Sequence, residues 1–90
     1  MSNKPRKEVD KDGTIRYYND KNELHREDGP AIEWADGLKE WYKNGKRHRE
    51  DGPAIERANG KKEYWYNNIS YPKIKTNKEW KKFVKLIIFI

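Results

Sequence analysis

One nine-residue stretch occurs twice in this chain without change. Residues 25–33 read HREDGPAIE, and the same letters return at residues 48–56, an offset of 23 positions. An identical stretch at a spacing of roughly 20 to 50 residues is typical of proteins built from stacked repeat units. A chain of 90 residues forms one domain at most. We therefore expect a single domain assembled from successive copies of one small motif.

The composition limits how much core such a domain can have. Hydrophobic residues make up 33% of the chain and charged residues 40%, which is close to the composition of disordered proteins. Four Trp, six Tyr and two Phe supply large apolar side chains, and each aromatic ring buries a large area. We expect a thin structure in which rings lie on a sheet. The chain contains no Cys, which excludes disulfides and thiolate sites.

Turn signals divide the repeats into runs that are too short for stable helices. Asn, Asp and Gly tolerate the positive φ angles that tight hairpins need. Pairs of them occur at Asp36-Gly37, Asn44-Gly45, Asn59-Gly60 and Asn67-Asn68. The runs between these turns carry aromatic and β-branched residues, as strands do, at residues 14–19, 31–34, 38–43, 54–57 and 61–66. Residues 26–30 and 49–53 are predicted return loops, in which Pro marks the start of the next strand.

Adjacent aromatic residues mark the same place in each predicted unit. The pairs Tyr17-Tyr18, Trp41-Tyr42 and Trp65-Tyr66 are spaced by 24 positions, so the repeat is 23 or 24 residues long, with one-residue slips inside the turns. Side chains alternate between the two faces of a strand, and each pair therefore puts one ring on either face. Core packing is the first interpretation of these rings. A stacking platform for a ligand, including single-stranded nucleic acid, is the alternative.

The last part of the chain has the pattern of an amphipathic helix. Thr76 and Glu79 have the spacing of a capping box. Apolar residues then recur at helical spacing, and lysines occupy the opposite side: Trp80, Phe83, Val84, Ile87 and Ile88 against Lys78, Lys81, Lys82 and Lys85. Residues 86–90 could instead end as a strand. The helix could cap the open end of the sheet, dock onto a partner or a second copy, or lie on a membrane surface.

The excess positive charge lies at the same end of the chain. Residues 1–60 carry 13 basic and 13 acidic side chains, whereas residues 61–90 carry eight Lys and two Glu, so the net charge of +6 arises there. An anionic membrane or nucleic acid would therefore meet the C-terminal third, and the balanced repeats are poor candidates for phosphate binding. Residues 1–11 lack the apolar segment of a signal peptide. No apolar run approaches a membrane span, so we expect a cytoplasmic protein.

The second unit resembles a known repeat. The string EWYKNGKRH at residues 40–48, preceded by Asp36-Gly37, is similar to the MORN repeat. The whole unit is more closely similar to the divergent variant with the pattern WYxNGxxHRxDGPA, which is associated with phages, large DNA viruses and some bacteria. The resemblance covers residues 13–72, and it implies β-hairpins stacked into an elongated sheet with a binding function. The first unit departs from it at residues 20–22, and the third lacks the HREDGP segment.

These observations predict a mainly β fold. We expect an antiparallel meander of about six strands, made of stacked hairpin repeats in a single sheet, with a C-terminal amphipathic α-helix as a cap. The expected divisions are a flexible lead-in at residues 1–12, two full units and a partial third at residues 13–72, and the helix at residues 73–90.

Two groups of residues have a possible chemical interpretation. His25 and His48 have acidic neighbours, but equivalent residues two strands apart lie about 10 Å from each other, too far to share one zinc ion. Packing or hydrogen bonding within each turn is the expected role. Glu27-Asp28 and Glu50-Asp51 could act in acid–base chemistry, but their duplication in loops favours surface ion pairs with neighbouring arginines. We expect no catalytic site, no metal and no cofactor.

The expected function is non-enzymatic binding of another protein. The resemblance suggests a small viral protein that binds or inhibits a host factor, such as a defence component. The sequence leaves open whether the chain forms homo-oligomers. The alternative function is binding of a membrane or polyanion through the basic helix. A weaker alternative function is sequestration of a small nucleotide. The candidate binding residues are the aromatics Tyr17, Tyr18, Trp34, Trp41, Tyr42, Trp65 and Tyr66, the loop residues His25, Arg26, Asp28, His48, Arg49 and Asp51, and the helix lysines Lys78, Lys81, Lys82 and Lys85.

Overall fold

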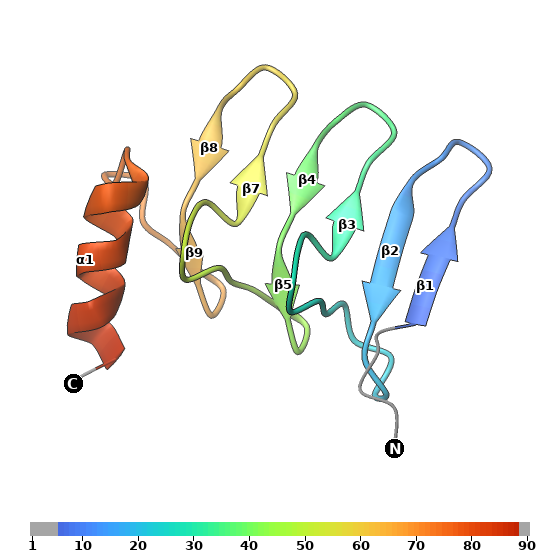
Figure 1. The fold of residues 1–90 in the computed structure, drawn as a ribbon, viewed down its shortest axis with the longest axis horizontal. Coiled ribbons are helices and arrows are strands. Elements are labelled where there is room, and N and C mark those ends of the chain that lie inside the picture. The colour runs from blue at the N-terminus through green and yellow to red at the C-terminus, as the bar shows by residue number, and fades with distance from the viewer. Residues whose placement is uncertain (1–5, 89–90) are drawn as a thin grey trace.

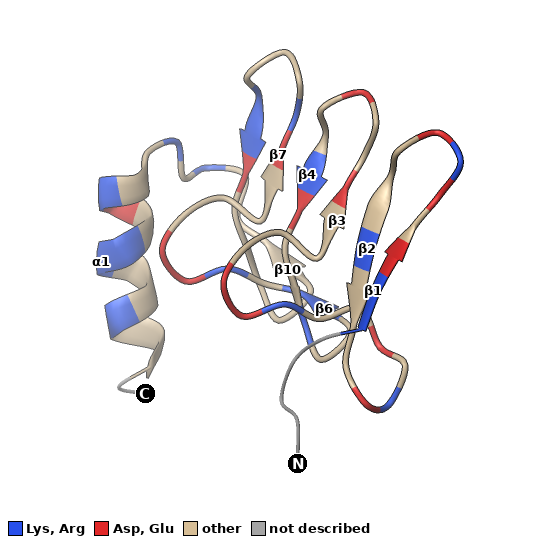
Figure 2. Ribbon diagram, turned by 45° about the vertical axis from the view of Figure 1, so that its right-hand side comes forward, with Lys and Arg blue, Asp and Glu red and all other residues tan. Residues whose placement is uncertain are grey.

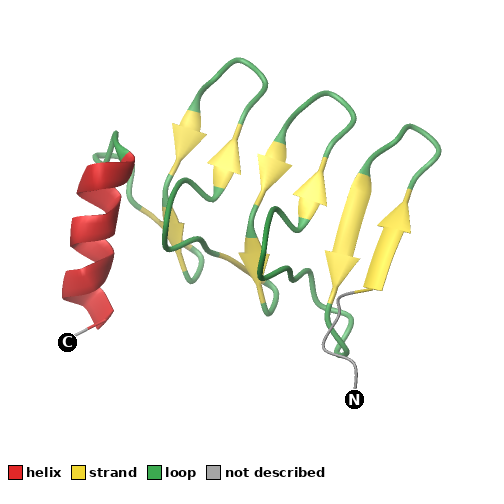
Figure 3. Cartoon of the chain, in the orientation of Figure 1, coloured by secondary structure: helices red, strands yellow, loops and turns green. Residues whose placement is uncertain are grey.

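The computed structural model describes residues 6–88. These residues form ten short strands followed by a helix (Figures 1 and 3). The strands are β1 (Arg6–Val9), β2 (Ile15–Tyr18), β3 (Ile32–Glu33), β4 (Lys39–Glu40), β5 (Tyr42–Lys43), β6 (Lys46–Arg47), β7 (Ile55–Glu56), β8 (Lys62–Glu63), β9 (Trp65–Tyr66) and β10 (Ile69–Ser70), and the helix is α1 (Asn77–Ile88).

The strands pair with antiparallel neighbours and form a thin layer. Six of them make one sheet in the order β1-β2-β3-β4-β7-β8, and the pairs β5-β6 and β9-β10 form two small hairpins. These hairpins continue β4 and β8 below the main sheet in Figure 1. The extents of the molecule are 38 × 36 × 17 Å. The predicted meander of hairpins with a C-terminal helix is confirmed, with the small hairpins in addition to the six strands.

The first strand lies where a flexible lead-in was expected. β1 pairs with β2 from Arg6↔Tyr18 to Val9↔Ile15, so the sheet begins at Arg6 and that prediction is wrong for residues 6–12. Residues 1–5 lie outside the described residues. All four residues of β1 are exposed, and an exposed strand leaves no alternation of apolar and polar residues in the sequence. The backbone pairing with β2 decides the strand.

The third unit is in a different register from the one that the aromatic pairs suggested. The carbonyl oxygens of Tyr17, Trp41 and Tyr64 accept hydrogen bonds from the backbone N–H groups of His25, His48 and Tyr71. Tyr64 is therefore the equivalent of Trp41, and Trp65 is the equivalent of Tyr42. The alignment of Trp65-Tyr66 with Trp41-Tyr42 was wrong because backbone hydrogen bonds, and not the type of ring, set strand register.

The predicted turns have the expected backbone conformation. Positive φ angles occur at Gly37, Asn44, Gly45, Gly60, Asn67 and Asn68. The first unit has a longer tip, in which Asn19 N donates to the carbonyl oxygen of Glu23 and Asn22 has a φ of 66°. This extra residue explains why the period is 24 between Tyr17 and Trp41 and 23 elsewhere.

The helix begins at the predicted capping box. Glu79 N donates to Thr76 Oγ1 and Thr76 N donates to Glu79 Oε1, each at 3.1 Å. The bond from the backbone of Lys75, followed by the one from the Thr76 side chain, lowers the pKa of Glu79. Residues 86–88 continue the helix, which rules out the strand alternative for them, and residues 89–90 lie outside the described part. Residues 73–76 were predicted as part of the helix, but they lie before its first residue, Asn77.

The core of the protein lies between the third unit and α1. Tyr64, Trp80 and Val84 are buried together, with Trp80 fully inaccessible. The rings of Tyr71 and Phe83 pack against this cluster. A second line of buried residues follows the repeats at Ala31, Ile32, Pro53, Ala54 and Ile55.

Within residues 6–88, no helix has the length and apolarity needed to cross a membrane.

Candidate binding surfaces on the two faces of the sheet

The sheet has two faces with different side chains. Cross-strand partners share a face, and the register Arg16↔Ile32↔Glu40↔Ile55↔Glu63 defines one of them. We call it the aromatic face, because it also carries Tyr18, Trp34, Tyr42 and Trp65. The other is the loop face, which carries Tyr17 and Trp41 beneath the return loops at residues 26–30 and 49–53, and Tyr64 beneath α1. The adjacent aromatics of each pair therefore lie on opposite faces, as predicted.

A buried carboxylate organises the centre of the aromatic face. Glu40 is only 7% exposed. Its two oxygens accept hydrogen bonds from Trp34 Nε1 at 2.6 Å, Tyr42 Oη at 3.0 Å and Arg47 Nη2 at 2.9 Å. The Arg47 guanidinium lies over the ring of Trp65, 4.7 Å from its centroid. Burial, together with the charge of Glu40, raises the pKa of Tyr42, so this hydroxyl stays a hydrogen-bond donor.

The same alternation of ring, cation and carboxylate extends across the whole face. Toward the N-terminus, the guanidinium of Arg16 lies 5.2 Å from the centroid of Trp34. Toward the C-terminus, Glu63 accepts hydrogen bonds from Arg57 Nη2 at 2.6 Å and from Trp65 Nε1 at 3.3 Å. Because rings and guanidinium groups attract each other, these side chains hold one another in place without a second layer.

Acid is expected to weaken this face through Glu63. The hydrogen bond from Arg57, with a smaller one from Trp65, lowers the pKa of Glu63 below 4.5. A carboxyl whose pKa is lower in the folded state stabilises the fold above the unfolded-state value, and this contribution is lost as the pH falls through the folded-state pKa. The melting temperature should therefore fall steeply below about pH 4.5, and less steeply in Glu63→Gln.

Thermal unfolding followed by circular dichroism from about pH 7 to about pH 3 measures this effect. Glu79→Gln is the control for the capping box, since the pKa of Glu79 is lowered as well. Identical curves for wild type and Glu63→Gln would contradict the assignment.

On the loop face, one arginine holds each return loop in shape. Arg49 donates to Asp51 Oδ1 at 2.9 Å, to the Pro53 carbonyl oxygen at 3.0 Å and to Glu56 Oε2 at 2.8 Å. Its guanidinium lies 4.0 Å from the ring centroid of Trp41. A Cβ at Gly52 would lie 2.9 Å from Arg49 Cζ, so the glycine leaves room for the stacked guanidinium. The expected ion pairs with the arginines form at Asp28 and Asp51, whereas Glu27 and Glu50 lie against His25 and His48 instead.

The first loop repeats this arrangement. Arg26 donates to Asp28, Pro30 and Glu33 at 3.0, 3.2 and 3.1 Å, and its guanidinium lies 4.1 Å from the centroid of Tyr17. The repeated nonapeptide is therefore explained by one loop that is closed twice by the same contacts.

Each histidine joins its own loop to the next unit. Nδ1 of His25 accepts a hydrogen bond from Asn44 N at 2.9 Å, and Nε2 lies 3.1 Å from Glu27 Oε1. His48 repeats both contacts with Asn67 and Glu50, each at 3.1 Å. The contact to the acidic neighbour is within the turn, as predicted, whereas the Nδ1 bond crosses to the following hairpin. Both ring nitrogens are engaged, and within residues 6–88 no group of three potential ligands is placed to hold a metal.

An open cavity of about 670 Å³ lies between the two loops. Residues 26–30 line one side and residues 48–51 the other, with Trp41 and Lys43 between them. Five of the six loop residues that the sequence suggested line the cavity, and His25 does not. Four carboxylates line it, from Glu27, Asp28, Glu50 and Asp51, together with the cations Arg26, Lys43 and Arg49.

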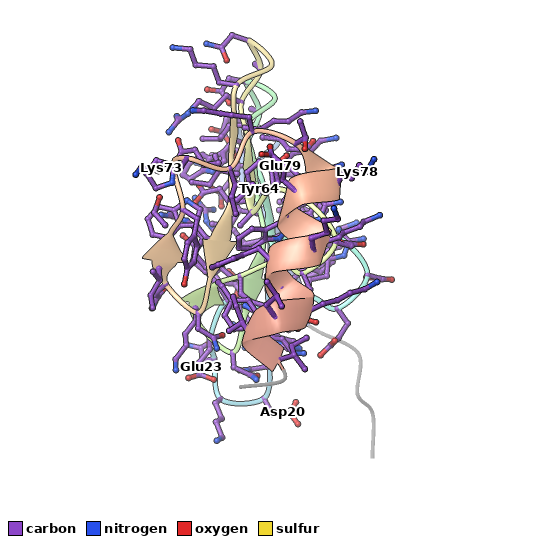
Figure 4. All side chains as sticks on the ribbon, turned by 90° about the vertical axis from the view of Figure 1, so that its left-hand side faces the viewer. Asp20, Glu23, Tyr64, Lys73, Lys78 and Glu79 are labelled. Carbon is purple, nitrogen blue, oxygen red and sulfur yellow. The ribbon has the colours of Figure 1, made fainter. Side chains whose placement is uncertain are left out.

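The helix replaces a third return loop. The ring centroid of Trp80 lies 5.4 Å from that of Tyr64. Tyr64 is the residue of the third unit that is equivalent to Tyr17 and Trp41. Its Nε1 donates to the carbonyl oxygen of Arg49 at 2.8 Å. Trp80 thus takes the position over Tyr64 that arginines take over the other two rings, and α1 caps the last unit. The lysines at residues 78, 81, 82 and 85 remain exposed, and Lys78 extends from the helix away from Tyr64 (Figure 4).

The structure divides the predicted aromatic residues between several environments. Tyr66 packs edge-on against the ring of His48, with centroids 4.5 Å apart, and the others lie on the two faces as described. Glu40, Arg47 and Tyr64 are central but were not among the predicted residues. The alternation of Glu40 with Tyr42 two positions later was a signal that both point to one face.

No family model matches the chain, and comparison with curated proteins and with solved structures found no match either. The resemblance of residues 13–72 to the MORN repeat therefore stays a prediction.

Proposed function

We propose that the chain is a non-enzymatic protein-binding module that recognises its partner through the aromatic face. One observation carries this proposal. The half-buried rings of Trp34, Tyr42 and Trp65 lie on one face, and α1 packs on the other side through Tyr64. Trp, Tyr and Arg are the residues that most often dominate the free energy of protein–protein binding.

The hydrogen bonds on this face support the same proposal. Glu40 fixes the side chains of Trp34, Tyr42 and Arg47 at once. Side chains that are already fixed lose little conformational freedom on binding, which leaves more of the contact energy as affinity. A suitable partner is a protein surface on which apolar groups are flanked by both positively and negatively charged groups. The resemblance to a viral repeat predicts that this partner is a protein of the infected host, and this stays a prediction.

A pair of matched substitutions tests the proposal. Trp65 lies on the aromatic face and Trp41 on the loop face, and both are half-buried. A partner captured by the full chain from a cell extract should bind Trp65→Ala about 2 kcal/mol more weakly, roughly thirty-fold in Kd. The control Trp41→Ala should bind within about three-fold of wild type.

The affinities can be measured by biolayer interferometry after circular dichroism has shown that both variants are folded. Unchanged affinity in Trp65→Ala, or an equal loss in both variants, would place the binding surface elsewhere.

Binding to an anionic surface through α1 is the second candidate function. Four lysines of this helix are exposed, at residues 78, 81, 82 and 85, and each lysine near an anionic membrane contributes about 1 kcal/mol. Trp80 and Val84 are buried in the core, so only the end of the helix, with the exposed Leu86 and Ile88, is free to insert. Sedimentation with phosphatidylserine vesicles that is lost in about 500 mM salt would favour this candidate. Small-nucleotide sequestration stays a weaker candidate, because the loop cavity holds both carboxylates and the cations Arg26, Lys43 and Arg49.

A further inference from the structure

Two regions of opposite net charge lie side by side in the chain: Figure 2 shows acidic residues on the return loops and lysines on the neighbouring helix α1. Each return loop, at residues 26–30 and 49–53, has one arginine and two carboxylates, a net charge of −1, and the glutamate of the adjoining strand brings each nonapeptide to −2 with its histidine neutral. The helix α1 has four lysines and one glutamate, a net charge of +3. The helix stacks on Tyr64, in line with the loops on Tyr17 and Trp41. Loops and helix therefore project from the same face of the sheet.

The groups that define these patches point into solvent. The side chains of Asp28 and Asp51 are 85% and 76% exposed. At the end of α1, Leu86 and Ile88 are 66% and 55% exposed. The acidic loops thus border an open cavity, and the basic helix has an apolar end of its own.

From this arrangement we infer that the chain forms a homodimer in which two loop faces meet about a two-fold axis. The helix α1 of each copy lies against the acidic return loops of the other, with its apolar end toward the cavity between them. A two-fold interface is self-complementary, so each contact occurs twice. Because both charges are on one chain, a second copy neutralises both patches in one step, whereas a basic protein or an anionic surface would neutralise only one.

This pairing is independent of the proposed function. It uses the loop face and leaves the aromatic face, with Trp34, Tyr42 and Trp65, free on both outer sides of the dimer. A dimer would then present two copies of the proposed binding surface.

Sedimentation velocity of the full chain at two salt concentrations gives the first test. We expect a species of twice the 10.9 kDa chain mass at about 50 mM salt, and at least a ten-fold weaker dimer at about 500 mM, because ions screen contacts between exposed charges. A monomer at both salt concentrations, up to the highest soluble protein concentration, would overturn the inference. So would a dimer with no dependence on salt.

Charge reversal tests which surfaces meet. Lys81→Glu with Lys85→Glu makes the helix acidic, and Asp28→Lys with Asp51→Lys makes the loops basic. Each double variant alone should be monomeric at low salt. Mixed in equal amounts, they should form a heterodimer, because the acidic helix then meets basic loops and the basic helix meets acidic loops. Lys11→Glu with Lys61→Glu, at exposed hairpin tips, is the control for net charge and should remain dimeric.

Circular dichroism of each variant establishes that it is folded before its mass is measured. Variants that are folded yet still dimeric alone, or a mixture of the two that remains monomeric, would show that these patches do not meet. Binding of the wild type to phosphatidylserine vesicles as a monomer, with no dimer in solution, would assign the helix to a lipid surface and overturn the inference as well.

Discussion

Replacing Trp80 with alanine is expected to lower the free energy of unfolding by about 3–5 kcal/mol, the range typical of a fully buried tryptophan. Trp80 is inaccessible to solvent, and its ring contacts Tyr64, Tyr71 and Phe83. Its Nε1 also donates to the backbone of Arg49. A loss of this size is a large share of the stability of a small domain, so we expect α1 to detach from the sheet.

Urea unfolding followed by tryptophan fluorescence and by far-ultraviolet circular dichroism measures this loss. A detached α1 should unfold, because an isolated helix of 12 residues is marginal in water. In about 500 mM salt, at which the inferred dimer dissociates, the control Leu86→Ala changes an exposed residue of the same helix and should stay within about 0.5 kcal/mol of wild type. Loss of less than about 1 kcal/mol in Trp80→Ala would mean that the helix contributes little to the fold.

Replacing Glu40 with alanine is expected to cost about 3 kcal/mol, because it leaves a partly buried cation without its partner. Arg47 Nη2, Trp34 Nε1 and Tyr42 Oη would all lose an acceptor. Arg47 Nη2 would keep its hydrogen bond to the neutral Tyr42 Oη at 2.8 Å but no carboxylate, and its buried Nε has no hydrogen-bond partner within residues 6–88. Glu40→Gln keeps one acceptor oxygen and should cost less.

The midpoint of urea unfolding at neutral pH gives the comparison between the Glu40 variants. Lys39→Ala is the matched control, because Lys39 is the exposed neighbour on the same strand, and it should be close to wild type. Equal stabilities of Glu40→Ala and Lys39→Ala would contradict the role assigned to the network. If the aromatic face binds a partner as proposed, Glu40→Ala should also weaken binding, because the rings would no longer be held in place.

The local features of this fold could be predicted because neighbouring residues decide them. Asn44-Gly45 and Asn67-Asn68 adopt positive φ angles, which Asn and Gly tolerate best. Thr76 and Glu79 cap the helix within one turn of the chain. The repeated nonapeptide, closed by the same arginine contacts each time, determined that the units are alike.

Only the tertiary structure decided how these parts are matched. The strand β1 depends on the open edge of β2, and no apolar pattern in residues 6–9 shows it. Trp65 is the equivalent of Tyr42, and Tyr64 therefore of Trp41, because the carbonyl oxygens of Tyr42 and Trp65 accept hydrogen bonds from Arg26 N and Arg49 N, each 16 positions earlier in the chain. Trp80 takes the place of a third loop arginine by contacting a carbonyl 31 positions earlier in the chain. Such contacts depend on groups far apart in sequence, which become neighbours only when the whole sheet has formed.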